Sequence, residues 1–408
     1  MVSTDTRHRV TVAEAESLIL GNLKDWGTQR VPLAAAGGEI LRETLVTERD
    51  QPPFDRVTMD GVAIRYSAFA AGRHTFALVG TQGAGGQPIP VPDDRSCVAI
   101  MTGAALPPGT DSVVPVERLV RDGQQITIHA GYQPQAGQFV HRQGSDHGRG
   151  AVVLVPGCRL GPTEMAVLTT TGNLEVEVAR RPQITVASTG DELVDVGLPM
   201  TATQIRSSND RAIAAALATR GFSACRRRHL PDDRAVLEHE LAELLATQDV
   251  LILSGGVSMG EFDFVPTVLA DLGVRVIFHK VLQKPGLPLW FGVSPDGKPV
   301  FALPGNPVSS LVCLVRYVAP ALLAALGATP SPPERVRLGT PLHFEPAMTW
   351  FVPTVLHYED DGQCLAMPRP PNTSGDFISL GGTDGFIELP ADRVDFPAGF
   401  PARFFRWS

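Results

Sequence analysis

Residues 250–260 read VLILSGGVSMG, a short apolar run followed by a turn that contains paired glycines and two serines. A run of four to eight apolar residues bounded by turn residues is typical of a strand buried on both faces. A helix is predicted directly after the turn, at 264–272. The stretch therefore predicts a strand, a glycine-bearing loop and a helix, which is the repeating unit of an α/β fold.

The same alternation extends on both sides of this stretch. Further strands are predicted at 183–188, 224–230, 274–281 and 299–303, and further helices at 211–220, 233–247 and 307–326. Asn209 or Asp210 is expected to cap the helix at 211–220, and Gly221 to end it. Strict alternation of strands and helices predicts a parallel sheet with helices on both faces.

Three other kinds of segment surround this α/β part. Residues 10–45 show helical spacing of apolar residues, and 62–129 contain short β-rich runs separated by Gly and Pro. After a proline-rich linker at 330–333, the remaining residues are strand-like and predict a small β-barrel or sandwich. The expected domains are 1–50 with 131–180 (helical and linker), 51–130 (β-rich), 181–329 (α/β) and 334–408 (β-barrel).

Composition and charge exclude several classes of protein. The chain has 408 residues and a net charge of -8, so it offers no long basic face for nucleic acid. Its five cysteines lack CxxC spacing, which argues against a zinc site or a disulfide framework and fits a reducing cytoplasm. We see no signal peptide and no uninterrupted apolar run of the ~18 residues that a membrane span needs. A cytoplasmic protein without nucleic-acid or membrane partners is expected.

Unusual loops follow several of the predicted strands. They are STGDE at 188–192, SGGVSMG at 254–260 and LPGNP at 303–307, and QKPGLP at 283–288 adds the positive charge of Lys284. In an open α/β sheet, ligands bind beyond the carboxyl ends of the strands, where glycine lets backbone N–H groups approach them. Two of these loops lead into helices, whose N-termini favour anions. Together the loops predict an anion-binding crevice.

Each loop also has a purely structural interpretation. A Gly-Gly turn before a helix is more often structural than functional, and Lys284 beside a turn is more often a solvated surface lysine. For Asp232 and Asp233, capping of the following helix is slightly favoured over a functional role. The convergence of four such loops at one sheet edge nevertheless favours the crevice. A phosphate placed among its acids needs a divalent cation, and carboxylate ligands indicate Mg²⁺.

Three polar loops also interrupt the N-terminal half. PFDRVTMDGVA at 53–63 contains Asp60, IMTGAALPPGTD lies at 100–111, and the loop at 144–150 contains Asp146. Each has more Gly, Pro and polar residues than a simple connector needs. Whether these loops reach the crevice of the same subunit or that of a partner is left open by the residues themselves.

Six stretches, in this order, resemble the molybdopterin molybdenumtransferase family, which includes bacterial MoeA proteins and the E domain of gephyrin. They are PPFDRVTMDGVAIR (52–65), IMTGAALPPGTDSVVPVE (100–117), STGDELV (188–194), SGGVSMGEFDFV (254–265), QKPGLP (283–288) and LPGNPVSSLV (303–312). The resemblance covers nearly the whole chain. It implies a helical segment, a β-rich domain, an α/β molybdopterin-binding domain and a C-terminal β-barrel, in a homodimer whose crevice is built from two subunits.

The resemblance further implies a Mg²⁺-dependent transferase that inserts molybdate into adenylyl-molybdopterin and releases AMP. Catalytic roles are implied for Lys284 and Asp263, and for Asp60 and Asp146 from the partner subunit. Mg²⁺ is expected on Asp263 and Glu192. The substrate-binding residues that the resemblance implies are Thr189, Gly190, Glu192, Ser254, Gly255, Gly256, Ser258, Pro304, Gly305, Asn306 and Ser309.

Three positions depart from the family pattern. Leu287 lies where a second lysine is usual, Pro353 and its neighbours replace a common arginine, and Gly144-Ser145-Asp146 lacks one acid. Two of these changes remove positive charge from the expected molybdate site. Lys280, Arg206 and His279 are the candidates to compensate, and residues 373–379 are candidates to supply hydroxyls.

Two other functions fit the same residues. Related α/β domains adenylylate molybdopterin, and a crevice that lacks two cations favours that step; a molybdopterin adenylyltransferase is also a candidate partner. A non-catalytic scaffold, as in the receptor-clustering role of the gephyrin branch, is less favoured because the chain has no long disordered linker. Molybdate and tungstate have the same shape and charge, so the sequence does not distinguish molybdenum from tungsten.

Overall fold

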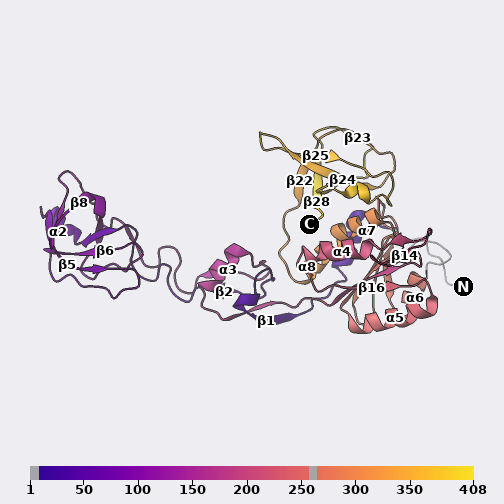
Figure 1. The fold of residues 1–408 in the computed structure, drawn as a ribbon, viewed down its shortest axis with the longest axis horizontal. Coiled ribbons are helices and arrows are strands. Elements are labelled where there is room, and N and C mark those ends of the chain that lie inside the picture. The colour runs from indigo at the N-terminus through magenta and orange to yellow at the C-terminus, as the bar shows by residue number, and fades with distance from the viewer. Residues whose placement is uncertain (1–8, 257–263) are drawn as a thin grey trace. The chain divides into compact units, whose positions relative to one another are not determined.

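The computed structural model describes residues 9–256 and 264–408, which fold as two compact units. Unit 1 comprises Met1–Arg42, Pro156–Gly161 and Glu175–Ser408, and unit 2 comprises Glu43–Val155 and Pro162–Leu174. Figure 1 draws most of unit 1 in magenta to yellow and most of unit 2 in indigo to purple. The finer division into four domains remains a prediction.

A six-stranded sheet lies at the centre of unit 1. In spatial order its strands are β16 (Arg226–Leu230), β13 (Ile184–Thr189), β17 (Val250–Ser254), β21 (Pro299–Leu303), β20 (Trp290–Val293) and β18 (Arg275–His279). The first four are parallel, as the alternation predicted. Strand β20, which was not predicted, runs antiparallel to both of its neighbours.

Helices cover both faces of this sheet. They are α4 (Asn209–Ala218), α5 (Arg234–Thr247), α6 (Val265–Asp271), α7 (Pro307–Cys313) and α8 (Ala319–Ala325). Alternate residues of β13 point to opposite faces: Val186 packs in one apolar cluster with α4 and α7, and Ala187 in another with α5 and α6. All residues of β13, β17 and β21 are buried, as expected for central parallel strands.

The helix starts test the capping predictions. The Asp233 carboxylate accepts a hydrogen bond from the Val236 N–H at 3.0 Å, so Asp233 caps α5 as expected. The predicted cap of α4 is wrong, because the helix begins at Asn209 and Ser208 holds the capping position without a side-chain bond. The side chain of Asn209 makes other contacts, which belong to the site described below.

The predicted helix at 307–326 is one helical run with an internal irregularity. A π-helical turn, Leu314–Val318, separates α7 from α8. The run Pro307–Ala325 is long and apolar enough to cross a membrane by length and composition alone. However, 78% of it is buried inside the fold, which is the environment of a core helix.

The N-terminal segment is less helical than predicted. Helix α1 covers only Val12–Leu20, where Thr11 and Glu14 form a capping box, and it ends at Gly21. The chain then forms β1 (Thr28–Pro32), which pairs with β12 (Glu175–Ala179). The helical spacing of apolar residues therefore applies to the first part of 10–45 only.

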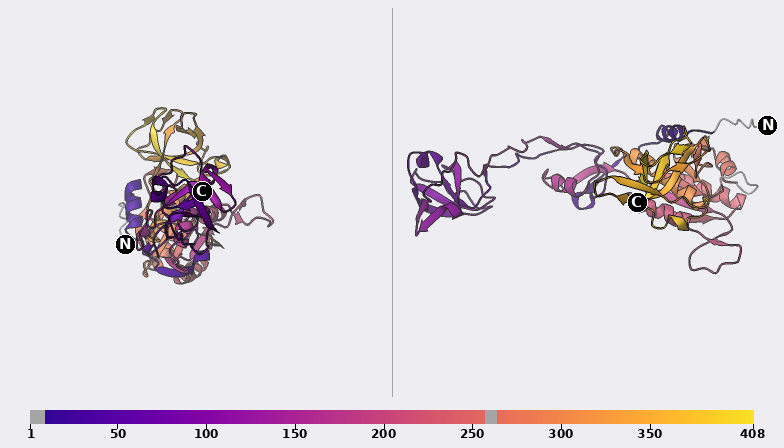
Figure 2. Two further views of the ribbon diagram at one scale, coloured as in Figure 1. Left: turned by 90° about the vertical axis from the view of Figure 1, so that its left-hand side faces the viewer. Right: turned by 90° about the horizontal axis from the view of Figure 1, so that it is seen from above.

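The C-terminal strands of unit 1 form the predicted β-barrel. They follow the order β24 (Thr349–Tyr358), β25 (Cys364–Pro368), β22 (Glu334–Leu338), β28 (Pro401–Arg406) and β26 (Gly385–Leu389). A further pairing of β24 with β26 closes the circle. Strand β19 (Gln283–Lys284), from the α/β part of the chain, adds to β24 in parallel. Figure 2 (left) draws the barrel strands in yellow, at the top of the view.

Unit 2 is rich in β-structure, as predicted for 62–129. Its sheet has the order β7 (Ser112–Pro115), β4 (Gly61–Ile64), β6 (Ser96–Ile100), β5 (Thr75–Gln82), β9 (Gln125–Ile128) and β8 (Leu119–Asp122). Two short ribbons accompany it, in which β3 (Arg56–Val57) pairs with β10 (Val140–His141), and β2 (Leu45–Val46) with β11 (Val152–Leu154). Helices α2 (Tyr66–Ala70) and α3 (Pro162–Thr169) complete the unit.

Candidate functional site

A hollow of about 780 Å³, here called the polar cleft, lies at the carboxyl ends of the parallel strands. Strands β13, β17 and β21 end side by side, since Ser188 is opposite Ser254 and Ser254 is opposite Leu303. The loops that follow these strands therefore line one cavity, as predicted. From the expected set the cleft contains Thr189, Gly190, Glu192, Ser254, Gly255, Gly256, Pro304, Gly305 and Asn306.

The glycine pair after β17 is required by its surroundings. Gly255 has φ +99°, and a Cβ at this position would lie 2.7 Å from the Thr189 carbonyl oxygen. Gly256 has φ +68°, and its Cβ would lie 2.7 Å from Val265 Cγ2. A side chain at either position is thus excluded by both conformation and space. The turn presents bare backbone to the cleft, as close approach of a phosphate requires.

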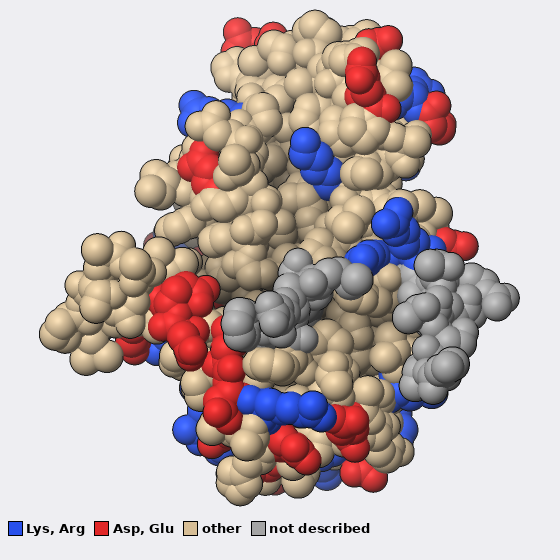
Figure 3. Space-filling model, turned by 90° about the vertical axis from the view of Figure 1, so that its right-hand side faces the viewer, with Lys and Arg blue, Asp and Glu red and all other residues tan. Residues whose placement is uncertain are grey.

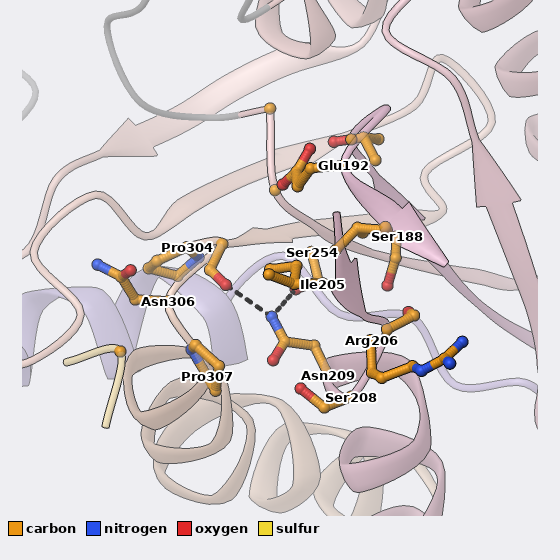
Figure 4. A pocket seen from close by; sticks show the side chains of 18 of the residues that line it. Ser188, Glu192, Ile205, Arg206, Ser208, Asn209, Ser254, Pro304, Asn306 and Pro307 are labelled. Atoms are coloured by element: carbon orange, nitrogen blue, oxygen red, sulfur yellow. Dashed lines mark hydrogen bonds between the residues drawn. The ribbon is translucent and has the colours of Figure 1, made fainter. Parts of the chain in front are cut away.

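Asn209, which the sequence suggested as a helix cap, holds two of the loops together. Its Nδ2 donates to Ser254 Oγ and to the Gly305 carbonyl oxygen, each at 2.8 Å (Figure 4). Ser254 Oγ lies 3.2 Å from Ser310 Oγ, and Ser310 donates to the Pro304 carbonyl. One amide therefore joins the end of β17 to the loop after β21, which explains why it does not cap α4.

Two hydroxyls at the end of β13 have no hydrogen-bond partner within the described part of the chain. They are Ser188 Oγ and Thr189 Oγ1, in residues that are 1% and 5% exposed and that line the polar cleft. A buried hydroxyl without a partner costs about 1–3 kcal/mol. Hydrogen bonds to a bound polar ligand would remove that cost, so the floor of the cleft is suited to an oxygen-rich ligand.

Carboxylates occupy one side of the cleft. Glu192 and Asp232 both line it, and Asp191 accepts a hydrogen bond from the Asp232 N–H at 3.2 Å. Figure 3 shows a hollowed face with mainly uncharged side chains and a group of acids along one margin. Asp233 caps α5, so its structural interpretation holds. Asp232 lines the cleft instead. No cluster of three or more metal-binding side chains occurs among the described residues.

A second hollow, here called the lysine pocket, has a volume of about 410 Å³ and shares Pro288, Pro304 and Asn306 with the cleft. One wall is the loop that carries Lys284, and the opposite wall comes from the barrel. Of the predicted residues, Lys284 and Ser309 line this pocket and not the cleft. The barrel residues in its wall are Met348, Trp350, Phe351, Pro353, Pro370, Pro371, Asn372, Thr373 and Ser374.

Lys284 is the one basic side chain among the described residues that line the lysine pocket. Its Nζ lies 5.5 Å from the centre of the Phe344 ring. Leu287 and Pro353, two of the departures from the family pattern, both line this pocket and add apolar surface. The pocket thus combines a single positive charge with aromatic and proline surfaces.

None of the three suggested compensating cations reaches the lysine pocket. Arg206 lines the polar cleft instead, and its Nη1 donates to the carbonyl oxygens of Asp195 and Leu198 at 2.7 and 2.8 Å. Lys280 and His279 are not among the described residues that line either hollow. The suggestion that residues 373–379 supply hydroxyls fits in part, because Thr373 and Ser374 line the lysine pocket.

Asp60 and Asp146 lie in unit 2, each held by a specific neighbour. Asp60 Oδ1 accepts hydrogen bonds from the Thr102 N–H and hydroxyl, both at 2.7 Å. These bonds, the backbone bond first, lower the pKa of Asp60. Asp146 Oδ1 lies 2.9 Å from His141 Nε2, in the loop after β10. Ser258 and Asp263, two further predicted residues, lie outside the described part of the chain.

Sequence reasoning did not single out Asn209 or Phe377 for the site. Asn209 carries a polar group into the cleft, and Phe377 lines the cleft from the barrel, together with Gly375. The run SSND at 207–210, between a strand and a helix, was the available signal for Asn209. Residues 373–379 were expected near the site for their hydroxyls, whereas the place of the Phe377 ring in the cleft depends on how the barrel packs.

Comparison with known proteins bears on the whole chain. Residues 10–172 match the MoeA N-terminal region (domain I and II), 185–324 a probable molybdopterin binding domain, and 335–403 the MoeA C-terminal region (domain IV). A Synechocystis protein named molybdopterin molybdenumtransferase is 37% identical over 399 residues, covering 98% of this chain and 100% of that protein. The chain belongs to the molybdopterin molybdenumtransferase (MoeA) family.

Other relatives agree with membership of the MoeA family. A Nostoc protein with the same name is 31% identical over 382 residues, covering 91% of this chain and 87% of that protein. The crystal structure of a molybdopterin biosynthesis MoeA protein from Pyrococcus horikoshii OT3 is 26% identical with a TM-score of 0.81, covering 98% of this chain and 100% of that one. The resemblance and the fold class predicted from sequence are confirmed.

Proposed function

We propose that this MoeA family member is a molybdopterin molybdenumtransferase, which inserts molybdate into adenylyl-molybdopterin and releases AMP. One observation carries the proposal: the glycine-bearing loops after β13, β17 and β21 line a single cleft, and this cleft adjoins the pocket that Lys284 lines. The cleft suits a nucleotide and its phosphates, and the lysine pocket suits a small oxyanion. The two hollows meet at Pro304 and Asn306, so both ligands would be adjacent.

In the polar cleft, the work of the chain is to bind and orient the adenylylated substrate. The bare backbone of Gly255, Gly256 and Gly305 allows close approach of phosphate oxygens. The buried hydroxyls of Ser188 and Thr189 are available to a polar group of the ligand. Holding the cleaved phosphate in a fixed position supplies catalysis by proximity and charge stabilisation rather than by a covalent enzyme intermediate.

In the lysine pocket, the ammonium of Lys284 would neutralise part of the charge of molybdate, a tetrahedral dianion. Ser309, Thr373 and Ser374 line the same pocket and offer hydroxyl donors in place of the missing cations. The dithiolene sulfurs then bind the metal as one molybdate oxygen leaves as water with the two thiol protons, and water cleaves the pyrophosphate bond so that AMP leaves. Tungstate has the same charge and shape, so the pocket offers no basis for separating the two oxyanions.

The donor set of the cleft fits Mg²⁺ as an additional cofactor. Glu192 and Asp232 provide carboxylate oxygens in the described part, and Asp263 remains the predicted further ligand. Mg²⁺ typically takes one or two carboxylates together with substrate phosphates and water, which agrees with the lack of a larger described ligand cluster. Bound there, it would polarise the phosphate that is cleaved.

We also propose a cytoplasmic homodimer in which Asp60 and Asp146 of one subunit complete the cleft of the other. Both side chains are held in place within unit 2, by Thr102 and His141. A molybdopterin adenylyltransferase, as the supplier of the adenylylated substrate, is a further candidate partner. Dimerisation is tested by sedimentation of the purified chain, and site sharing by mixing Asp60→Asn and Lys284→Ala subunits, which should partly restore activity.

The decisive experiment measures AMP release from adenylyl-molybdopterin with Mg²⁺, with and without molybdate. Molybdate-dependent AMP release is expected. Release of pyrophosphate from ATP and molybdopterin without molybdate would instead favour the adenylyltransferase alternative. A chain that binds the substrate but shows neither reaction would favour a scaffold.

A further inference from the structure

Directly before Lys284 lies Gln283, a polar side chain that is completely buried. Gln283 is 0% exposed, whereas Lys284 is exposed, because successive residues of β19 point in opposite directions. A buried amide must have hydrogen-bond partners for its oxygen and its nitrogen, or it destabilises the fold. The hydrogen-bond partners of Gln283 therefore show which parts of the fold this buried amide joins.

The oxygen of this amide is bound from the core helix. Tyr317, 3% exposed, donates a hydrogen bond from its hydroxyl to Gln283 Oε1. Tyr317 lies in the π-helical turn Leu314–Val318, the irregular part of the long run between α7 and α8. Burial raises the pKa of the Tyr317 hydroxyl, so it remains a donor at neutral pH.

The nitrogen of the same amide is bound to the lysine loop itself. Gln283 Nε2 donates to the Pro285 carbonyl oxygen at 3.1 Å and approaches Cys313 Sγ at 3.4 Å. Space around it is filled: a Cβ at Gly286 would lie 2.5 Å from Gln283 Nε2 and 2.6 Å from Cys313 Sγ. The Pro285 carbonyl, in the loop that follows Lys284, is thus held by the buried side chain of Gln283, a residue that also lines the lysine pocket.

The donor residue is in turn anchored by the core. The guanidinium of Arg316 is 2% exposed, donates to Glu388 at 2.7 Å and to Glu16 at 2.9 Å, and lies 5.2 Å from the centre of the Tyr317 ring. Glu388 belongs to the barrel and Glu16 to α1. Tyr317 therefore sits beside an ion-paired group that joins three parts of unit 1.

We propose that Gln283 and Tyr317 are positioning residues that fix the 284–288 loop and so place the Lys284 ammonium in the lysine pocket. The proposal rests on the proposed function, in which Lys284 binds the oxyanion. It assigns to the core helix a role in oxyanion affinity, although no residue of the π-helical turn touches the pocket in the described structure.

The test uses the full chain with Tyr317→Phe, which removes one hydroxyl and keeps the ring beside Arg316, and with Gln283→Met, which removes the amide and keeps the length. Thr171→Val is the matched control, because it removes a buried hydroxyl that donates to the Leu168 carbonyl at 2.7 Å in unit 2. Steady-state AMP release should show the molybdate KM raised about fivefold to tenfold in both variants. The KM for adenylyl-molybdopterin should change by less than about twofold.

A double-mutant cycle separates positioning from general destabilisation. If the hydroxyl acts through Lys284, Tyr317→Phe should raise the molybdate KM of the wild type and add nothing in a Lys284→Ala background. The control should lower the thermal midpoint without changing either KM. A Tyr317→Phe variant with the molybdate KM of the wild type would overturn the proposal, as would equal shifts of both KM values.

Hydrogen exchange keeps the inference testable if the proposed function fails. A Lys284→Ala variant with an unchanged molybdate KM would show that Lys284 does not bind the oxyanion, whatever holds its loop. In that case the hydrogen-exchange rates of the backbone amides in 286–289 test whether Tyr317 holds the loop. Tyr317→Phe should exchange faster there while Thr171→Val does not, and equal protection in both variants would overturn positioning.

Discussion

The polar cleft lies at the strand ends of a parallel sheet, whereas the lysine pocket lies between a loop of the same domain and the C-terminal barrel. The cleft is lined by glycines, hydroxyls and carboxylates, and two of its hydroxyls have no partner among the described residues. The pocket is lined by proline and aromatic surfaces around one lysine. The cleft therefore offers many backbone and hydroxyl groups beside its carboxylates, while the pocket offers a single positive charge among its described residues.

The largest effect is expected from removing that charge. Lys284→Ala should lower kcat/KM for molybdate about 100-fold, because one preorganised donor to a charged oxyanion is lost. AMP release at varied molybdate measures it. Lys280→Ala, a nearby lysine that lines neither hollow, is the control and should behave as the wild type. An equal loss in both variants would mean that the pocket does not depend on one charge.

A smaller effect is expected from breaking the polar network of the cleft. Asn209→Ala leaves Ser254 Oγ and the Gly305 carbonyl without their shared donor, at a cost of about 1–3 kcal/mol. The KM for adenylyl-molybdopterin should rise, and the molybdate KM should change little. Chemical denaturation and steady-state kinetics measure both quantities. If molybdate binding fell instead, the two hollows would not act separately.

The difference between the polar cleft and the lysine pocket can be enlarged by adding the second lysine that the family pattern has at position 287. Leu287→Lys adds a second ammonium to the wall that carries Lys284, and should lower the molybdate KM about fivefold. The gain should shrink at high ionic strength, because the added charge is screened. Leu287→Met is the neutral control. An unchanged molybdate KM at low salt would show that charge does not limit binding.

The smallest effect concerns the thiol behind the lysine pocket. Burial raises the pKa of the Cys313 thiol to about 12, from 9.0 in the absence of burial. In the unfolded chain the thiol loses its proton first, so this contribution to stability is complete below pH ~9 and is lost as the pH rises toward ~12. Cys313→Ser should reduce the alkaline loss of unfolding free energy relative to the wild type. Urea titrations at neutral and alkaline pH measure the difference, and equal losses would contradict it.

The two hollows also differ in how well the sequence predicted them. The loops after β13, β17 and β21 each follow an apolar strand directly, so the rule that parallel strands end together placed their glycines in one cleft. The far wall of the lysine pocket comes from residues 348–374, which are distant in sequence and reach Lys284 only through barrel packing. Strand β20 was missed because nothing in the alternation required an antiparallel strand there.

Side-chain roles were harder to predict than loop positions. Asn209 has the chemistry of a helix cap and occupies a helix start, yet its amide binds Ser254 and Gly305. Local sequence cannot choose between these uses, because the choice depends on where β17 and β21 end in space. The role of Gln283 could not be predicted for the same reason, since its hydrogen-bond partner Tyr317 is 34 residues away in sequence.

The pairing of β19 with β24 joins the lysine loop to the C-terminal barrel within unit 1. Cutting the gene after residue 329 would leave a fragment with its nucleotide cleft largely formed but with open solvent where Trp350 and Pro353 now face Lys284. Such a fragment would still bind an adenylylated ligand. Its Lys284 would face open solvent, however, because the barrel residues that line the lysine pocket would be absent. On the proposed assignment, oxyanion binding would depend on the barrel more than nucleotide binding would, since of the described barrel residues only Gly375 and Phe377 line the polar cleft.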